Sequence, residues 1–273
     1  MLELVEGPIT VALRGPLAEL EKASDELSFR PENYWRATSY QLYEQTNGEK
    51  GWDGYLRPLR IRTEPELVGY LPRGLVSRLE TVLDMLGIRL EKRLLVNRFV
   101  NLVPDDLPDD LLQGEFPLDE DQRTCIVEWL SCGLGIHAVT VGGGKTATFA
   151  GAAELLKRQM PNLRILYVTH TERLVRQSFT EFKRFLPHRL ITQFGGGVRD
   201  PSGQDIVVST NAILYRNMRE LARDGWFKTF GAVMYDEVHH AASESAEKVL
   251  SKVTAYYRFG ASDSVKELSL IHI

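Results

Sequence analysis

The sequence predicts an α/β protein in two parts, a small mixed α/β domain followed by a lobe built on a mostly parallel sheet. From about residue 111 onward, short apolar runs alternate with amphipathic stretches, the pattern of a parallel sheet covered on both faces. Before this point, aromatic β-prone runs are mixed with single helical stripes. The connection between the parts, residues 103–110, is rich in proline and aspartate, which indicates an exposed linker.

In the first part, the runs at 34–46 and 52–62 are aromatic and β-prone, and Asn47-Gly48 and Gly51 lie between them. This pattern predicts a β-hairpin. The other elements expected here are a strand over 9–13, a helix from near Pro16, a helix over 74–86 and a strand over 88–96.

In the second part, strands and helices are expected to alternate. The strands are predicted at 136–141, 164–169, 190–194, 205–209, 232–235 and 257–260. The helices are predicted near 120–131, 145–158, 172–186, 211–223 and 244–253. Ligands of such sheets bind at the carboxyl ends of the strands, so the site is expected there.

The composition is that of an ordinary globular protein, with 43% hydrophobic and 26% charged residues among 273. No apolar run is long enough to span a membrane and no signal-peptide pattern is present, so we expect a cytoplasmic protein. The net charge of −4 gives no general argument for nucleic acid. Lys and Arg outnumber Asp and Glu in residues 55–100 and 157–199, which is weak support for such a partner.

The segment Val-Thr-Val-Gly-Gly-Gly-Lys-Thr, residues 139–146, predicts a phosphate-binding turn between a strand and a helix. Gly142, Gly143 and Gly144 allow several backbone N–H groups to point at one anion. Lys145 is expected to reach the β- and γ-phosphates of ATP, and the Thr146 hydroxyl to bind Mg²⁺. Valine stands where the usual pattern begins with glycine, so a plain glycine-rich turn with an exposed lysine is the alternative.

A second group of polar residues follows the apolar strand expected at 232–235. Asp236 is expected to hold Mg²⁺ and Glu237 to act as general base on the attacking water. His239 is expected to link this site to neighbouring segments. The alternatives are a surface carboxylate pair with histidines capping the next helix, or a two-histidine metal site, which adjacent histidines on one turn disfavour.

Asp-Glu-Val-His, residues 236–239, resembles the DExH box of superfamily 2 helicases and translocases. The resemblance implies a RecA-like P-loop lobe that uses ATP and Mg²⁺, with Gln122 reading the adenine base. Residues 169–177 resemble motif Ia of this superfamily, with His170 where proline is common, and 195–197 and 206–214 resemble its nucleic-acid-binding segments.

These matching segments imply that Thr169, Arg173, Gly196 and Thr210 contact nucleic acid. Residues 257–264 resemble a further family motif, which couples ATP hydrolysis to nucleic-acid binding. Asp263 replaces an alanine in this motif, so its coupling role does not transfer directly.

Two segments of the first part, 51–57 and 70–79, resemble the domain that precedes the motor in XPB-like and phage UvsW-like helicases. The resemblance implies engagement of branched or distorted DNA. Trp52 and Arg57, with Tyr55 and Arg60, are candidates to stack on bases or bind phosphates. The alternative makes Trp52 and Tyr55 core aromatics of the hairpin.

The family's motor has two RecA-like lobes with ATP between them, and the second supplies arginines to the transferring phosphate. We expect a DNA-recognition-like domain over 1–110 and the first lobe over 111–267, with the second lobe missing. Residues 268–273, Leu-Ser-Leu-Ile-His-Ile, correspond to a translated transposon mosaic end used in sequencing libraries. Our hypothesis is that the gene fragment ends near Glu267, that the residues after it are a read-through artefact, and that the fragment alone binds ATP weakly and hydrolyses it poorly. The alternative is that the tail is a genuine short strand.

The function expected from these patterns is that of an ATP-dependent DNA helicase or translocase that remodels forked or branched DNA in repair or recombination. Two alternatives remain open. One is a nucleic-acid-binding module whose lobe does not hydrolyse ATP, and the other is the motor of a restriction complex.

Overall fold

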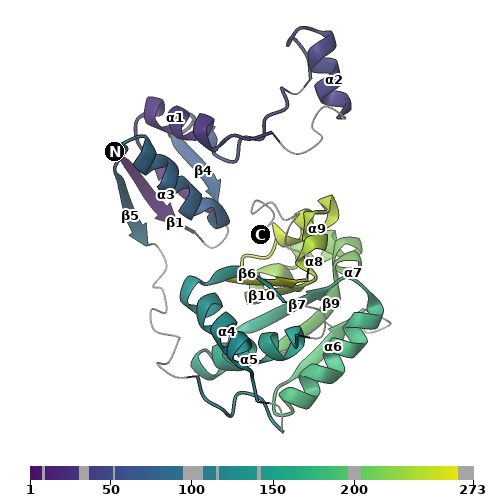
Figure 1. The fold of residues 1–273 in the computed structure, drawn as a ribbon. Coiled ribbons are helices and arrows are strands. Elements are labelled where there is room, and N and C mark those ends of the chain that lie inside the picture. The colour runs from purple at the N-terminus through teal and green to yellow at the C-terminus, as the bar shows by residue number, and fades with distance from the viewer. Residues whose placement is uncertain are drawn as a thin grey trace. The chain divides into compact units, whose positions relative to one another are not determined.

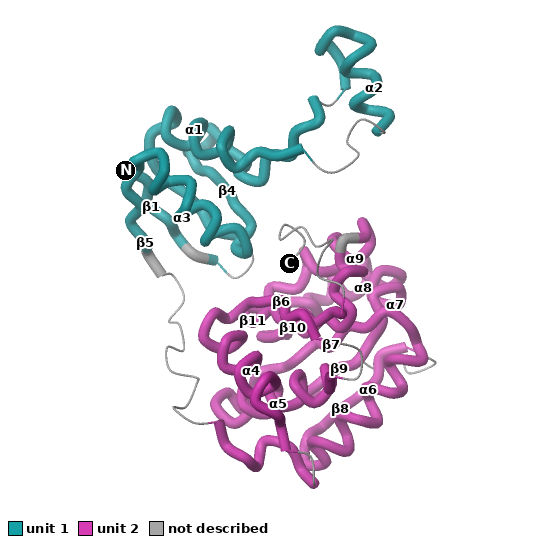
Figure 2. The backbone as a smooth tube through the Cα atoms, viewed as in Figure 1, with its two compact units in different colours: residues 1–97 teal, residues 98–273 magenta. Residues whose placement is uncertain are grey.

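The computed structural model forms two compact units, residues 1–97 and 98–273, which are described separately (Figure 2). It describes residues 1–7, 10–30, 37–51, 53–94, 107–114, 117–139, 143–195 and 204–263. The six-residue tail and residues 103–106 of the expected linker lie outside these ranges. Within them, no helix combines the length and the apolar character needed to cross a bilayer.

The first unit is built on a five-stranded sheet with the order β3-β4-β2-β1-β5. Its strands are β1 (Leu2–Glu6), β2 (Thr10–Arg14), β3 (Arg60–Arg62), β4 (Val68–Pro72) and β5 (Leu90–Leu94). Among the described strands of this sheet, only β1 and β5 pair in parallel. Helices α1 (Leu17–Leu27) and α3 (Val76–Met85) bury apolar residues, and a Cβ on Gly69 of β4 would lie 3.2 Å from Cδ2 of Leu20 in α1.

The predicted hairpin of 34–46 and 52–62 is wrong. Residues Thr38–Gln45 form helix α2, and β3 pairs with β4 instead. Tyr40 and Tyr43 are three residues apart and therefore share one helix face, where their ring centroids lie 6.4 Å apart. The Tyr40 hydroxyl also donates to Glu44 at 2.7 Å, so the aromatic residues that suggested a strand support a helical turn here.

The second unit contains a six-stranded sheet with the order β6-β11-β10-β7-β9-β8, in which every described pair is parallel (Figure 1). Its strands are β6 (Leu134–Ala138), β7 (Arg164–Thr169), β8 (Ile191–Phe194), β9 (Ile206–Thr210), β10 (Phe230–Asp236) and β11 (Tyr257–Ser262). The helices are α4 (Glu120–Cys132), α5 (Lys145–Gln159), α6 (Glu172–Phe185), α7 (Asn211–Arg216), α8 (Met218–Arg223) and α9 (Glu244–Leu250). The predicted α/β fold with a mostly parallel sheet is confirmed.

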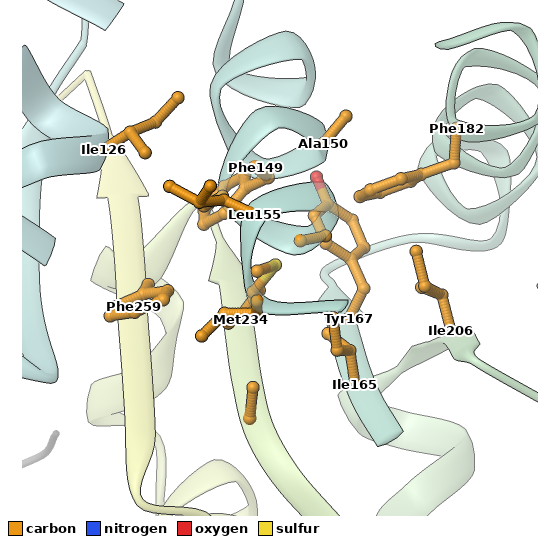
Figure 3. Close-up of a cluster of buried hydrophobic side chains, with 14 of the residues drawn as sticks. Ile126, Phe149, Ala150, Leu155, Ile165, Tyr167, Phe182, Ile206, Met234 and Phe259 are labelled. Carbon is orange, nitrogen blue, oxygen red and sulfur yellow. The ribbon is translucent and has the colours of Figure 1, made fainter. Parts of the chain in front are cut away.

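Alternate residues of the central strands belong to two separate apolar clusters, one on each face of the sheet. On β7, Ile165 and Tyr167 join the cluster that includes α4, α5 and α6, whereas Leu166 and Val168 join the cluster that includes α7, α8 and α9. Figure 3 shows part of the first cluster, in which Tyr167 lies among apolar side chains. The helices therefore cover both faces, and the polar strand ends remain available for a site.

Candidate nucleotide-binding site

The glycine turn and the end of β10 meet at one ion pair. Gly144 adopts the left-handed conformation (φ 70°) and caps α5, so that the helix begins at Lys145. The Lys145 Nζ atom lies 2.5 Å from Oε1 of Glu237, a residue 92 positions later in the sequence. Both side chains are largely shielded from solvent, with 13% and 24% exposed. The structure thus brings together the lysine and the carboxylate that the sequence places in the phosphate-binding and hydrolytic roles.

Asp236 is the last residue of β10 and is buried. Its Oδ1 atom accepts a hydrogen bond from the Glu237 N–H at 3.0 Å. Burial raises the pKa of Asp236, and the negative charge of Glu237 raises it further, while Lys145 acts in the opposite direction. Thr146 stands in the first turn of α5. A hydroxyl and a carboxylate oxygen are hard ligands of the kind that Mg²⁺ prefers, so these two residues fit the ion.

The raised pKa of Asp236 predicts that its negative charge lowers the free energy of unfolding when no ligand is bound. The folded state retains the Asp236 proton at pH values where the unfolded chain has released it, so this contribution lowers stability as pH rises above the ordinary carboxyl range. We expect Asp236→Asn to increase the free energy of unfolding at pH 7 and to lose that advantage in acid. Urea unfolding at both pH values measures this, and a less stable variant at pH 7 would contradict it.

Gln122 is hydrogen-bonded both to the N-cap of α4 and to the glycine turn. Asp119 caps α4 in a capping box, in which the Gln122 N–H donates to Asp119 and the Gln122 Oε1 accepts from the Asp119 N–H at 3.0 Å. The Gln122 Nε2 atom donates to the Gly143 carbonyl at 3.2 Å. Both ends of the Gln122 amide are therefore already hydrogen-bonded. An adenine base has to replace these hydrogen bonds before Gln122 can bind it.

A cavity of about 320 Å³ opens beside this glutamine. Its lining residues come from the first half of α4, the end of β6, the glycine turn and the start of α5. They are Asp119, Asp121, Gln122, Cys125, His137, Ala138, Val139, Gly143 and Thr148. Burial raises the pKa of the Cys125 thiol to about 12, so this side chain is a neutral wall of the cavity. The size and the polar edge of the cavity suit a heterocyclic base.

Gly144 is expected not to tolerate a side chain. Its φ of 70° is strained for alanine, and an added Cβ would lie 2.2 Å from Nε2 of Gln122. Gly144→Ala should lose about 1–2 kcal/mol of stability from strain alone and also weaken nucleotide binding by displacing the glutamine. Gly225 has the same φ with open space around it, so Gly225→Ala isolates the strain. Equal nucleotide affinity in the two variants would contradict the role given to Gln122.

His239 connects the carboxylates with β11. Its Nδ1 atom lies 2.7 Å from the Ser262 hydroxyl and 3.4 Å from Oε2 of Glu237. The histidine thus contacts both segments, and its linking role stays a prediction. Asp263 follows Ser262 directly, and its carboxylate lies within 4.8 Å of ligand atoms of both Glu237 and His239, so the residue that departs from the family motif borders the site itself.

The expected nucleic-acid contacts lie at the ends of two adjacent strands. Thr169 ends β7 and Thr210 ends β9, and the two are register partners. Both side chains are buried: the Thr169 hydroxyl donates to the Thr171 carbonyl at 3.1 Å, and the Thr210 hydroxyl accepts from the Ile213 N–H at 3.2 Å. Arg173 is exposed on α6. In this structure both threonine hydroxyls are therefore hydrogen-bonded to the backbone that follows each strand, and they do not point into solvent.

Sequence reasoning missed a cavity of about 640 Å³ beside these strand ends. The rings of His170 and His240 stack there with centroids 3.8 Å apart, and Tyr215 and Arg216 line the same space. The signal was present in His170, which stands where proline is common, but its stacking partner lies 70 positions away in the sequence.

Three expected site residues, Trp52, Gly142 and Gly196, lie outside the described residues. In the first unit, Arg57 pairs with Asp53 at 2.5 Å, and the guanidinium lies 5.8 Å from the Tyr55 ring centroid. Tyr55 is 38% exposed, so the alternative that made it a core aromatic is wrong.

Comparisons with known proteins cover both units. The family model of the type III restriction enzyme res subunit (ResIII) matches residues 116–262, more than half of the chain. The ATP-dependent DNA helicase uvsW of Enterobacteria phage T4 is 24% identical over 230 residues, 79% of this chain and 43% of the relative, so the chain spans less than half of that protein's length.

Two solved structures share the fold. A crystal structure of the UvsW helicase from Bacteriophage T4 has a TM-score of 0.78 at 22% identity, covering 99% of this chain and 95% of that one. The Sulfolobus solfataricus SWI2/SNF2 ATPase core in complex with dsDNA has a TM-score of 0.51 at 19% identity, covering 61% and 37% of the two chains. The chain thus belongs to the type III restriction enzyme res subunit family, among the superfamily 2 helicases, and its fold resembles that of phage UvsW.

Proposed function

We propose that the protein is an ATP-dependent DNA helicase or translocase that remodels forked or branched DNA. The observation that carries this proposal is the Lys145–Glu237 ion pair, with buried Asp236 next to it and the glycine turn above. A lysine at a helix N-terminus beside two carboxylates is the arrangement required to hold the phosphates and Mg²⁺ of ATP and to orient a water molecule. ATP and Mg²⁺ are the proposed cofactors and a second RecA-like lobe the proposed partner.

Each group of site residues has a separate proposed role in ATP hydrolysis or DNA binding. The Gly143–Gly144 turn and Lys145 would bind the phosphates. Thr146 and Asp236 would hold Mg²⁺, which would supply neutralisation of the charge that develops on them. Glu237 accepts the proton of the attacking water. His239 lies between this carboxylate and Ser262 on β11, so it links a change in the charge of Glu237 to that strand. Thr169, Arg173 and Thr210 mark the proposed DNA track, with Arg57 in the first unit as a second contact.

The likeness to phage T4 uvsW supports a DNA helicase over a restriction motor. The restriction-subunit model matches only residues 116–262, whereas the alignment with the phage helicase extends over 79% of the chain. The relative is named an ATP-dependent DNA helicase. We place the proposed activity in the cytoplasm of a bacterium or infected cell, where such DNA is processed.

The test is binding of fluorescently labelled forked DNA and of duplex DNA of equal length, each with and without Mg²⁺ and a non-hydrolysable ATP analogue. We expect preference for the fork and a change of DNA affinity when the analogue binds, because the two sites share the strand ends of one sheet. Equal fork affinity with and without the analogue, together with absence of ATP hydrolysis after a second lobe is supplied, would favour the DNA-binding module instead.

A further inference from the structure

Tyr167 carries a buried hydroxyl group that packing does not explain. The residue lies on β7 with 0% of its surface exposed, and its ring makes edge-on contacts with Phe149 at 5.3 Å and Phe182 at 4.9 Å. Among the described residues, the hydroxyl oxygen has no hydrogen-bond partner. Phenylalanine would make the same ring contacts without the cost of an unsatisfied polar atom, so the hydroxyl calls for another explanation.

The hydroxyl lies beneath the residues that fit Mg²⁺. Tyr167 is the register partner of Met234 on β10, and Asp236 lies two residues further along the same strand. Because side chains alternate along a strand, Asp236 and Tyr167 are on the same face of the sheet. Figure 3 shows the oxygen of Tyr167 at the end of the ring away from β7, on the side of the helix that carries Ala150, which is α5.

The electrostatic surroundings agree with this placement. Burial raises the pKa of Tyr167 well above its ordinary value, and the negative charge of Asp236 raises it further. Thr146 and Ser178 also lie close enough to influence this pKa. A phenolic O–H is a hydrogen-bond donor, so this hydroxyl can donate to a nearby carboxylate.

We propose that Tyr167 is a positioning residue of the nucleotide site, whose hydroxyl donates a hydrogen bond to the Asp236 carboxylate when Mg²⁺ and nucleotide bind. This inference rests on the proposed function. Oδ1 of Asp236 already accepts from the Glu237 N–H, which fixes one side of the carboxylate. A second donor from β7 fixes its rotation and leaves lone pairs for the ion. Partners of metal-binding carboxylates act in this way, and their loss weakens metal binding about 10–100-fold.

The experiment compares Tyr167→Phe with Tyr235→Phe. Tyr235 is also buried, on the adjacent strand β10, but belongs to the cluster on the opposite face of the sheet. Two quantities are measured for each protein: the free energy of unfolding without ligand, and the Mg²⁺ concentration that gives half-maximal binding of a fluorescent ATP analogue, with affinity in EDTA as the baseline.

We expect Tyr167→Phe to be at least as stable as the wild type, because it removes an unsatisfied group. It should need about 10–100-fold more Mg²⁺, with unchanged affinity in EDTA. Tyr235→Phe should need the same Mg²⁺ as the wild type.

Unchanged Mg²⁺ dependence in Tyr167→Phe would overturn the inference, and so would an equal loss of affinity in EDTA, which indicates general damage to the site. Both results leave the proposed function intact. If the wild-type protein itself fails to bind the analogue at any Mg²⁺ concentration, the proposed function fails and this inference fails with it.

Discussion

Replacing Lys145 with alanine is expected to abolish useful nucleotide binding. The ammonium group stands at the first residue of α5, where the helix N-terminus and the glycine turn already favour an anion. Its removal deletes a charged hydrogen bond to the phosphates, worth up to ~3 kcal/mol, and so weakens affinity by about 100-fold. Titration of a fluorescent ATP analogue in the presence of Mg²⁺ measures the loss.

The matched control is Lys248→Ala. That lysine is also paired with a glutamate, Glu244, but on the exposed face of α9, far along the sequence from the glycine turn. The control should bind the analogue as the wild type does. If Lys145→Ala binds normally, the glycine turn is only a connection between a strand and a helix, and the phosphate site has to be sought elsewhere.

Glu237→Gln is expected to bind ATP more tightly and to lose hydrolysis. Without nucleotide, the Glu237 carboxylate is paired with the Lys145 ammonium at 2.5 Å. Incoming phosphates must displace this carboxylate from the lysine, and they are also repelled by its negative charge. Glutamine keeps the shape but removes both the charge and the basic oxygen. Loss of a general base lowers the rate by about 10²–10⁴-fold.

Affinity is measured with the same ATP analogue, and hydrolysis by phosphate release with DNA and a second lobe present. Glu244→Gln, which removes a similar charge from an exposed ion pair, should change neither quantity. Weaker nucleotide binding by Glu237→Gln would show that the carboxylate helps to hold the ligand and does not compete with it.

The strand pattern of the second unit could be predicted because each strand is a short apolar run with a turn or helix after it. The residues 164–169 show this most clearly, since β7 spans the predicted range. The site could be predicted for a related reason. In a parallel sheet, residues that follow the strands meet at one edge, and Lys145 and Glu237 lie 2.5 Å apart at such an edge.

The first unit was harder to predict because its decisive contacts are not local. Aromatic content at 34–46 suggested a strand, but Tyr40 and Tyr43 satisfy a helix equally well, and neighbours decide between them. Strand β1 was missed although Leu2 and Leu4 alternate correctly, since five residues carry little signal. The missing hydrogen bond of Tyr167 is invisible in a sequence, where a tyrosine in an apolar strand is an ordinary core residue.

The order of strands in the second sheet has a consequence for synthesis of the protein. Strand β6, which leads into the glycine turn, pairs only with β11 among the described strands, through partners such as Leu134 and Arg258. A growing chain therefore exposes β6 with unpaired backbone groups until β11 has left the ribosome. Pairing across so long a sequence separation is slow, so we expect the glycine turn that follows β6 to reach its final position only after β11 has been synthesised.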